Sequence, residues 1–310
     1  MKQTLKHYGP VAALLAVILA ASTCLSLLTG DSERDDRPRV LVTTYPLYVA
    51  AQNILGDADG VRLDMLSGGG AGCLHDYQLS PADRLAIERA DAVVINGVGA
   101  EPFLDGLVEE SCLVDTSAGL SYLYAPHHHH EGEEHAHEHT DYNEHVWLSP
   151  THYQQQVMTL AGSLMELVHG KEQSLLRRNA TAYLTAIDGA AQTLPDLNGR
   201  PCVLFHDSLA YLASDVGLDV KLTLSAEGES GLSAADLAQV EALAKENPDL
   251  VLLYDTQYPI RYTAVDGLVP AAQVIALETA VVGQGSPADW LDAMTRNGDK
   301  LRKLTGGDGL

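Results

Sequence analysis

Residues 201–217, PCVLFHDSLAYLASDVG, hold one complete strand–helix unit and decide the fold class. The first five of these residues are apolar and predict a buried strand that ends at His206. A helical pattern follows from Ser208 to Val216, and Gly217 closes it, since glycine is common just past the last helical turn. A strand that leads directly into a helix predicts an α/β fold.

The same alternation extends outward in both directions. Ser80-Pro81, Ser149-Pro150 and Ser233 mark helix starts, and Gly170 divides a long helical pattern between residues 151 and 194. Alternating strands and helices of this kind predict two mainly parallel sheets, each covered by helices on both faces. The predicted strands are 39–44, 61–66, 91–96 and 112–115 in the first half, and 201–205, 219–223, 250–254 and 272–277 in the second.

Length and charge narrow the class of protein. The chain has 310 residues, which suggests two domains. It carries 19 Lys and Arg against 42 Asp and Glu, a net charge of −23. Binding to a phosphate backbone needs a basic face, so this composition argues against a nucleic-acid partner and favours cations.

The N-terminus has the pattern of an export signal. Residues 1–10 carry Lys2 and Lys6, and residues 11–28 are uncharged and almost wholly apolar. Two interpretations stay open for residues 1–28: a signal peptide cleaved before a lipidated Cys24, or an uncleaved membrane anchor. Residues 29–37 are polar and predict a tether. Both interpretations place the protein outside the cytoplasm, tethered to the membrane.

Three cysteines remain in the exported part. Cys73 and Cys112 are the candidate disulfide pair, and Cys202 is predicted to be a small buried hydrophobe in its strand. Because the chain has no CxxC motif, a thiolate zinc site is disfavoured.

Histidine is the most informative residue type. Seven of the 13 histidines lie between residues 127 and 139, within a low-complexity loop at 125–144. His75, His145 and His206 instead fall at strand ends or helix starts, 70 and 61 residues apart. They meet only if the fold brings these junctions to one crevice, where α/β sheets bind ligands. Three imidazoles with a carboxylate such as Glu278 suit a tetrahedral Zn²⁺ site.

Five motifs in order then carry a family resemblance. The chain resembles the zinc-binding solute-binding proteins of bacterial ABC uptake transporters over residues 38–304. The motifs are Val40-Leu-Val-Thr-Thr-Tyr-Pro, His75-Asp-Tyr-Gln-Leu-Ser-Pro, Asn96-Gly-Val-Gly-Ala-Glu, His145-Val-Trp-Leu-Ser-Pro and Phe205-His-Asp.

The resemblance implies an architecture of two Rossmann-like α/β lobes with parallel sheets. A long rigid helix joins the lobes and the metal lies between them. The implied boundaries are 38–170 for the N-terminal lobe with its His-rich loop, 171–196 for the linker helix and 197–310 for the C-terminal lobe.

The resemblance also implies the ligands. His75, His145 and His206 match the family's three histidine ligands, and His206 favours zinc because manganese-preferring members usually carry a carboxylate there. Glu278 stands near the fourth ligand position, with Asp255 or water as alternatives. Asp76 and Asp207, each beside a ligand, are positioned to accept the second ring N–H of a histidine.

The implied function is capture of Zn²⁺ outside the cytoplasm and its delivery to a membrane ABC permease, by a monomer that is not an enzyme. The His-rich loop resembles insertions of zinc-selective members, which implies additional weak zinc sites. An extracellular zinc buffer or adhesin and a Mn²⁺-binding relative are the alternatives. A zinc hydrolase ranks last, because the chain has neither an HExxH nor a GxSxG motif.

Overall fold

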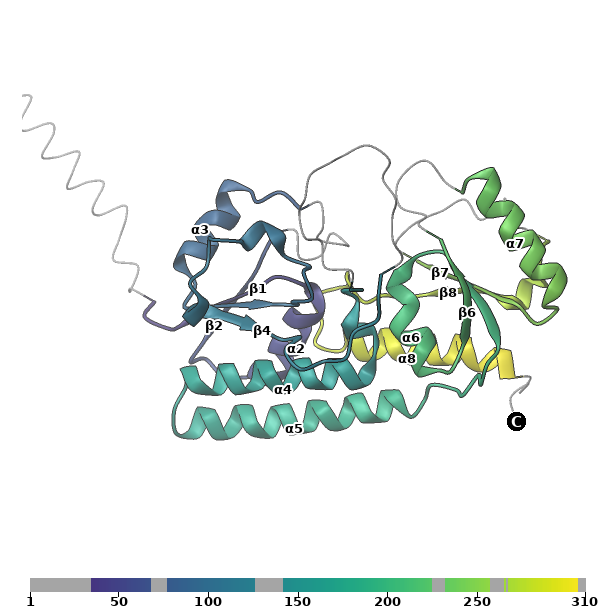
Figure 1. The fold of residues 1–310 in the computed structure, drawn as a ribbon. Helices are drawn as coiled ribbons and strands as arrows, with labels where there is room; N and C mark the ends of the chain where they lie inside the picture. Colours follow the sequence, from purple (N-terminus) through teal and green to yellow (C-terminus); the bar gives the residue numbers. More distant parts are fainter. Residues whose placement is uncertain are drawn as a thin grey trace, which may run out of the picture. The chain divides into compact units, whose positions relative to one another are not determined.

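Two parallel four-stranded sheets form the frame of the chain (Figure 1). The computed structural model describes residues 35–67, 77–125, 142–224, 232–256, 265 and 267–305. The first sheet contains β1 (Arg39–Val42), β2 (Arg62–Met65), β3 (Ala92–Ile95) and β4 (Leu113–Asp115). The second contains β5 (Pro201–Leu204), β6 (Asp219–Thr223), β7 (Val251–Asp255) and β8 (Val274–Leu277). The predicted fold of two parallel-sheet lobes is confirmed.

Both sheets have the same topology. The strand orders are β2-β1-β3-β4 and β6-β5-β7-β8, and every strand pair is parallel. The chain therefore reverses its direction of winding between β1 and β3, and again between β5 and β7. Ligands of such sheets bind beyond the carboxyl ends of the strands at these reversal points.

Helices begin where the sequence places capping residues. Ser80 and Ser233 each form a capping box with the aspartate three residues on, and the Ser149 side chain accepts from the backbone N–H of His152. Gly170, at φ +62°, separates α4 from the 21-residue α5. The helices are α2 (Tyr45–Leu55), α3 (Pro81–Arg89), α4 (Pro150–Leu167), α5 (Lys171–Ala191), α6 (Ala210–Asp215), α7 (Ala234–Glu246) and α8 (Asp289–Arg302), with short 3-10 turns η3 (Val146–Leu148) and η4 (Asp207–Leu209).

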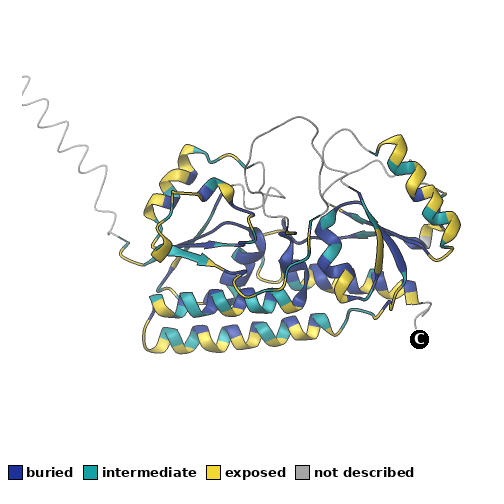
Figure 2. Cartoon of the chain, in the orientation of Figure 1, coloured by how far each residue is buried: buried dark blue, intermediate teal, exposed yellow. Residues whose placement is uncertain are grey.

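Alternate residues of each central strand face different cores. Val40 and Val42 of β1 join a large core that also holds Cys202 and Leu204 of β5, while Leu41 packs on the opposite face of the first sheet. The large core is built with residues of α2, α4, α5, α6 and α8; the outer faces are covered by α3 on the first sheet and α7 on the second. Figure 2 shows the buried strands between helices whose outer sides are exposed.

Several local predictions have clear outcomes. Cys202 is fully buried, as predicted. Tyr45-Pro46 forms the first turn of α2, because proline is compatible with the start of a helix. Residues 1–34 and Cys73 lie outside the described residues, so the signal, the tether and the Cys73–Cys112 pairing stay predictions.

The lobe boundaries stay a prediction as well, because Pro38–Leu310 forms one compact unit. α5 lies between β4 and β5 in the chain and packs against both α2 and α8, and its role as the linker helix stays a prediction. Within the part of the chain that is described, no helix combines the length and apolar character that a membrane crossing requires.

Candidate metal centre

His145 and His206 meet although 61 residues separate them in the chain. His206 lies two residues beyond the end of β5, and His145 directly precedes η3. Both are 2% exposed, and their ring centroids lie 5.4 Å apart with the rings nearly perpendicular, at 82°. With Asp207 they form a group whose candidate ligand atoms all lie within 4.8 Å of one another. This convergence of two nitrogen donors and one carboxylate is a candidate metal centre.

Asp207 lies between the two imidazoles. Its Oδ1 is 3.4 Å from Nδ1 of His206 and 3.8 Å from Nδ1 of His145. A carboxylate beside metal-binding imidazoles orients them and raises their basicity. The predicted role of Asp207, as acceptor of the second ring N–H of a ligand histidine, stays a prediction.

The loop after β5 is held from two sides. The backbone N–H of Ser208 donates to His206 Nδ1 at 3.0 Å, and the Ser208 hydroxyl donates to Asp255 Oδ2 at 3.3 Å. Asp255 ends β7, is 2% exposed and accepts a second hydrogen bond from Thr279 Oγ1 at 3.4 Å. Because β5 and β7 flank the reversal point of the second sheet, His206 and Asp255 lie where a ligand of this sheet would bind.

The segment that carries His145 is held by residues distant in sequence. Its ring lies 5.3 Å from that of Trp147, centroid to centroid. Trp147 Nε1 donates to the carbonyl of Thr279 at 2.8 Å, and Trp290 Nε1 of α8 donates to the carbonyl of Trp147 at 3.1 Å. The histidine from the first half of the chain is thus anchored on the segment between β8 and α8.

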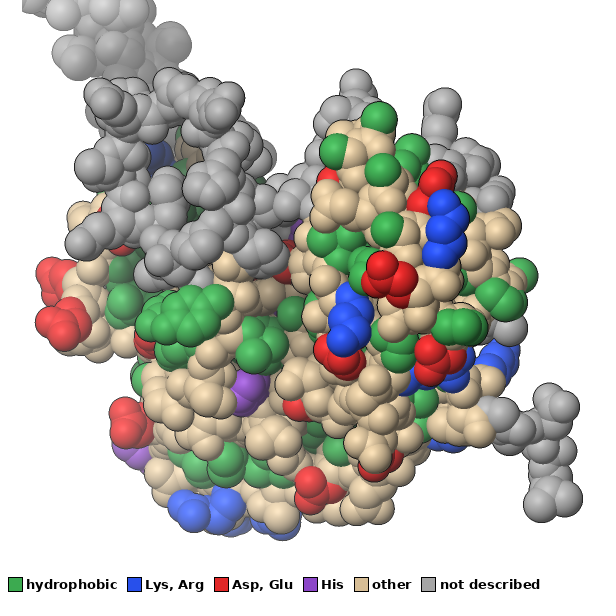
Figure 3. All heavy atoms as spheres, turned by 45° about the vertical axis from the view of Figure 1, so that its right-hand side comes forward, with side chains coloured by type: hydrophobic (Ala, Val, Ile, Leu, Met, Phe, Trp, Pro, Cys, Tyr) green, Lys and Arg blue, Asp and Glu red, His purple; other side chains and the backbone are tan. Residues whose placement is uncertain are grey.

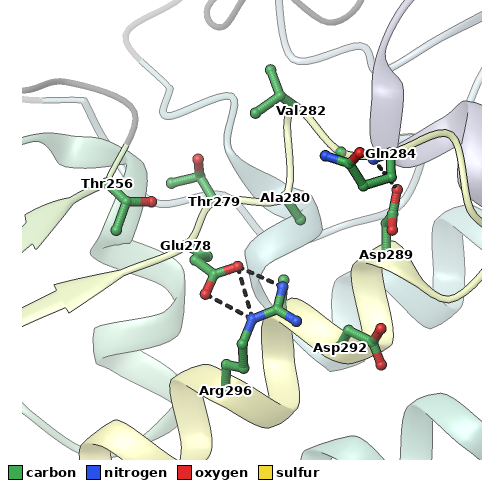
Figure 4. Close-up of a pocket in the computed structure, with 11 residues that line it drawn as sticks. Thr256, Glu278, Thr279, Ala280, Val282, Gln284, Asp289, Asp292 and Arg296 are labelled. Carbon is green, nitrogen blue, oxygen red and sulfur yellow. Dashed lines mark hydrogen bonds and ion pairs between the residues drawn. The ribbon is translucent and has the colours of Figure 1, made fainter.

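Glu278, the expected fourth ligand, has a different set of partners (Figure 4). Its carboxylate accepts from Nε and Nη2 of Arg296, the latter at 2.7 Å, and lies 3.6 Å from Nζ of Lys300. The hydrogen bond from Arg296 is the main cause that lowers the pKa of Glu278. Glu278 lines a cavity of about 380 Å³ with Thr256, Thr279 and Asp289 and is not in the His145–His206–Asp207 group. His75 and Asp76 lie outside the described residues.

A buried carboxylate occupies the reversal point of the first sheet. Glu101 accepts from Thr43 Oγ1 at 2.6 Å, and from the backbone N–H groups of Asn96 and Gly97 at 2.8 and 3.1 Å. Burial raises the pKa of Glu101 to about 7. Asn96 in turn donates through Nδ2 to the carbonyl of Glu144, the residue before His145. In the sequence, the Asn96-Gly-Val-Gly-Ala-Glu motif contributes only to the family resemblance. In the structure, its Asn96 side chain supports the segment that contains His145.

The surface charge is mixed. On the face shown in Figure 3, acidic and basic side chains of the described residues lie beside one another, and these residues form no single basic patch. The described part of this face therefore does not have the basic patch that binding to a phosphate backbone requires.

Comparisons with known proteins agree with the geometry. Over 270 residues the chain is 24% identical to "High-affinity zinc uptake system protein ZnuA" of Bacillus subtilis, covering 81% of each chain. It is 29% identical over 244 residues to "Zinc-binding lipoprotein AdcA" of Streptococcus pneumoniae serotype 4, covering 74% of this chain and about half, 48%, of AdcA.

The fold has solved counterparts. The solute-binding protein FpvC of Pseudomonas aeruginosa, solved in complex with Mn²⁺, aligns with a TM-score of 0.70 and 23% identity, over 87% of this chain and 99% of FpvC. Residues 40–304 match the family described as "Zinc-uptake complex component A periplasmic". The match covers most of the sequence, and the chain belongs to this family of periplasmic zinc-uptake components.

Proposed function

We propose that this protein captures Zn²⁺ outside the cytoplasm and delivers it to a membrane ABC permease. The observation that carries the proposal is the convergence of His145, His206 and Asp207 from distant parts of the chain. Two buried imidazoles beside a carboxylate form a donor set suited to a divalent transition metal. Membership of the zinc-uptake family supports zinc as the cargo and a permease as the partner.

We propose His75, His145 and His206 as the imidazole ligands, with Asp255 as the carboxylate ligand in place of Glu278. Asp255 ends the strand next to His206 and is linked to it through Ser208. Glu278 follows the outer strand β8, and coordination by its carboxylate would give up three charge-assisted contacts with Arg296 and Lys300.

Zinc is the proposed metal over manganese. Imidazole nitrogens suit Zn²⁺, whereas Mn²⁺ suits carboxylate, carbonyl and water oxygens, and at a given site the affinity for Zn²⁺ exceeds that for Mn²⁺. A three-histidine site therefore favours zinc. Manganese is the second candidate because the structural neighbour FpvC was solved with Mn²⁺.

The remaining parts of the proposal concern location and role. The apolar segment at residues 11–28 supports export and attachment to the membrane, through Cys24 or an uncleaved anchor. The proposed role is binding and transfer of a metal ion by a monomer, without catalysis.

A competition titration tests the metal and its ligands. Zn²⁺ and Mn²⁺ are titrated into the metal-free protein in the presence of a chelator of known affinity. We expect tight binding of one Zn²⁺ and weaker binding of Mn²⁺. His145→Ala and His206→Ala should each weaken zinc binding by more than about 100-fold, because they remove a ligand and not merely its hydrogen-bond partner.

His169→Ala is the matched control, since His169 is exposed just beyond α4. It should leave the affinity unchanged. If both buried-histidine variants bound zinc as tightly as the control, the proposed centre would be wrong. Delivery is tested separately, by growth at low zinc of cells that lack the protein and regain it as wild type or as His206→Ala.

A further inference from the structure

We infer that Asn143 is a positioning residue that selects which ring nitrogen of His145 faces the metal. Asn143 is 1% exposed and lies two residues before His145. The inference rests on the proposed function for the identity of the metal, but the state of the His145 ring that it assigns belongs to the metal-free protein.

Every hydrogen-bonding group of Asn143 has a partner. Oδ1 accepts from the backbone N–H of His145 at 2.9 Å and lies 3.0 Å from its Nδ1. Nδ2 donates to the carbonyl of Asp207 at 2.8 Å. The backbone N–H donates to the carbonyl of Leu123, and the backbone carbonyl accepts from Tyr211, both at 2.8 Å.

These partners fix the orientation of the amide. One side of the Asn143 amide faces a backbone N–H, which can only donate, and the other faces the Asp207 carbonyl, which can only accept. Turning the amide over would set donor against donor and acceptor against acceptor. Oδ1 is therefore the atom beside His145, because only this orientation satisfies both neighbours.

The orientation of the amide determines the tautomer of His145. Because Asn143 Oδ1 is an acceptor, His145 Nδ1 must carry the hydrogen that fills the 3.0 Å contact. The lone pair of the neutral ring then lies on Nε2, so Nε2 is the nitrogen able to bind a metal ion. Asp207 Oδ1, at 3.8 Å from the same Nδ1, is too distant to replace this hydrogen bond.

His206 has the opposite arrangement. Its Nδ1 accepts from the backbone N–H of Ser208, so that nitrogen does not carry the hydrogen in the metal-free protein. The two histidines of one group are thus held in different tautomers by different neighbours. Selection of Nε2 as the ligand atom is therefore a property of the Asn143–His145 pair, not of the group as a whole.

Asn143 also links the segments that carry the two histidines. Its Nδ2 bond to Asp207 and its carbonyl bond from Tyr211 of α6 tie the segment before η3 to the segment that carries His206. One residue thereby orients the first ligand and links it to the residue beside the second.

Three variants separate these roles. Asn143→Ala removes the acceptor for His145 and the link to Asp207. Asn143→Asp restores the acceptor but not the donor. Tyr211→Phe keeps the Asn143 side chain and removes the two hydrogen bonds of the Tyr211 hydroxyl, to Asn143 and Leu123.

The first readout is the tautomer of His145 in the metal-free protein, measured by long-range proton–nitrogen NMR on ring-labelled histidine and assigned with His145→Ala. The second is zinc affinity by chelator competition, and the third is the thermal midpoint. For wild type, Asn143→Asp and Tyr211→Phe we expect the Nδ1–H form. Asn143→Ala should populate the Nε2–H form and bind zinc about 10–100-fold more weakly, and Asn143→Asp should recover most of that loss.

An Nε2–H tautomer in the wild-type protein would overturn the inference whatever zinc does. So would an Asn143→Ala variant that keeps both the Nδ1–H form and wild-type affinity. If Asn143→Ala does not fold, an Nε2–H tautomer in Asn143→Asp would overturn the inference in its place. A wild-type protein with the expected tautomer but no zinc affinity would instead refute the proposed function and leave the Asn143 assignment standing.

Discussion

At the scale of single residues, two carboxylates from neighbouring strands differ in what holds them. Asp255 is buried and accepts hydrogen bonds from the hydroxyls of Ser208 and Thr279. Glu278 is partly exposed and paired with the guanidinium of Arg296. The described donors to Asp255 are neutral hydroxyls, whereas the described partners of Glu278 are cations that a metal ion would have to displace. Displacing these described partners should therefore cost Asp255 less than Glu278.

The first prediction follows from that difference. Asp255→Asn should weaken zinc binding by more than about tenfold, since it removes the charge of the proposed carboxylate ligand. Glu278→Gln should leave the affinity within about threefold and lower the free energy of unfolding by about 1 kcal/mol, the scale of a partly exposed ion pair. Chelator competition and urea unfolding measure the two quantities. If Glu278→Gln weakened zinc binding more than Asp255→Asn does, Glu278 would be the fourth ligand instead of Asp255.

The second prediction concerns Glu101 and pH. Burial raises the pKa of Glu101 in the folded protein from 4.5 to about 7, and the nearby Asp115 also raises it. The hydrogen bonds from Thr43, Asn96 and Gly97 lower this pKa but are outweighed by burial. Between those values the folded state keeps a proton that the unfolded chain has released, so the unfolded state binds fewer protons. The contribution of Glu101 to the free energy of unfolding therefore falls by up to ~3 kcal/mol as the pH rises from about 4.5 to 7. It is constant above about pH 7.

Glu101→Gln removes the titrating group, so its unfolding free energy should lack this part of the pH dependence. Urea unfolding of both proteins at half-unit steps from about pH 4.5 to 8 measures it. Parallel curves for the two proteins over that range would show that Glu101 is ionised throughout.

At the scale of elements, the strands could be predicted from sequence because apolar runs and capping residues act locally. β5, α3 and α7 lie close to their predicted positions, since Ser80 and Ser233 mark helix starts by their own hydrogen bonds. The partners of a site are not local. Arg296 lies 18 residues after Glu278 and one turn of α8 before Lys300. Nothing near Glu278 in the sequence indicates that Arg296 pairs with the Glu278 carboxylate.

Asn143 illustrates the same limit. Its distance of two residues from His145 is visible in the sequence, but its contact with Asp207 depends on how the two sheets are placed. Sequence patterns therefore predict the histidines and their strand ends, whereas the residues that orient them follow from the tertiary structure.

The third prediction compares two capping boxes of the same design. Asp83 is the carboxylate of the Ser80 capping box of α3, is 2% exposed and also accepts from Ser67 and Tyr77. Asp236 is the carboxylate of the Ser233 capping box of α7 and accepts from the backbone N–H of Ser233. Burial alone would raise the pKa of Asp83, but the hydrogen bonds from Ser67, Ser80 and Tyr77 outweigh it and hold the pKa well below 3.8. The stability that Asp83 contributes is therefore present above about pH 4 and is lost as the pH falls towards its folded pKa.

Asp83→Asn should lower the free energy of unfolding by about 2–3 kcal/mol at pH 7. The NH₂ group of the asparagine would face N–H and O–H groups that donate to the carboxylate in the wild-type protein. Asp236→Asn, the matched control, should cost less than about 1 kcal/mol. Urea unfolding of both variants compares them. Equal losses would mean that the contacts of Asp83 outside its own helix contribute nothing.

At the scale of the whole molecule, the two sheets share one core. Val40 and Val42 of the first sheet and Val251 and Leu253 of the second belong to one cluster of buried apolar side chains. Residues of α5 fill the same cluster, and α5 packs against α2, α4 and α8. Burial in a common core couples the elements on both sides of it, so neither sheet can lose its packing without exposing apolar surface of the other.

The last prediction tests this coupling with the two tryptophans of the chain. Trp147 precedes α4, Trp290 lies in α8 stacked on Tyr153 at 4.2 Å, and the indole N–H of Trp290 donates to the Trp147 carbonyl. Tryptophan fluorescence therefore reports on the junction, whereas far-ultraviolet circular dichroism reports on both lobes. Because the core is shared, we expect one urea transition with the same midpoint by both probes.

Saturating zinc should raise the urea midpoints of both probes together, since the metal binds only the folded protein. At a zinc concentration a thousandfold above the dissociation constant, the free energy of unfolding should rise by about 4 kcal/mol. His206→Ala serves as the control that removes the shift without removing a tryptophan. Two separated transitions, with fluorescence following only one of them, would mean that the lobes unfold independently. The shared cluster would then be a contact surface between two separate cores, and zinc would be expected to merge the two transitions by binding residues from both lobes.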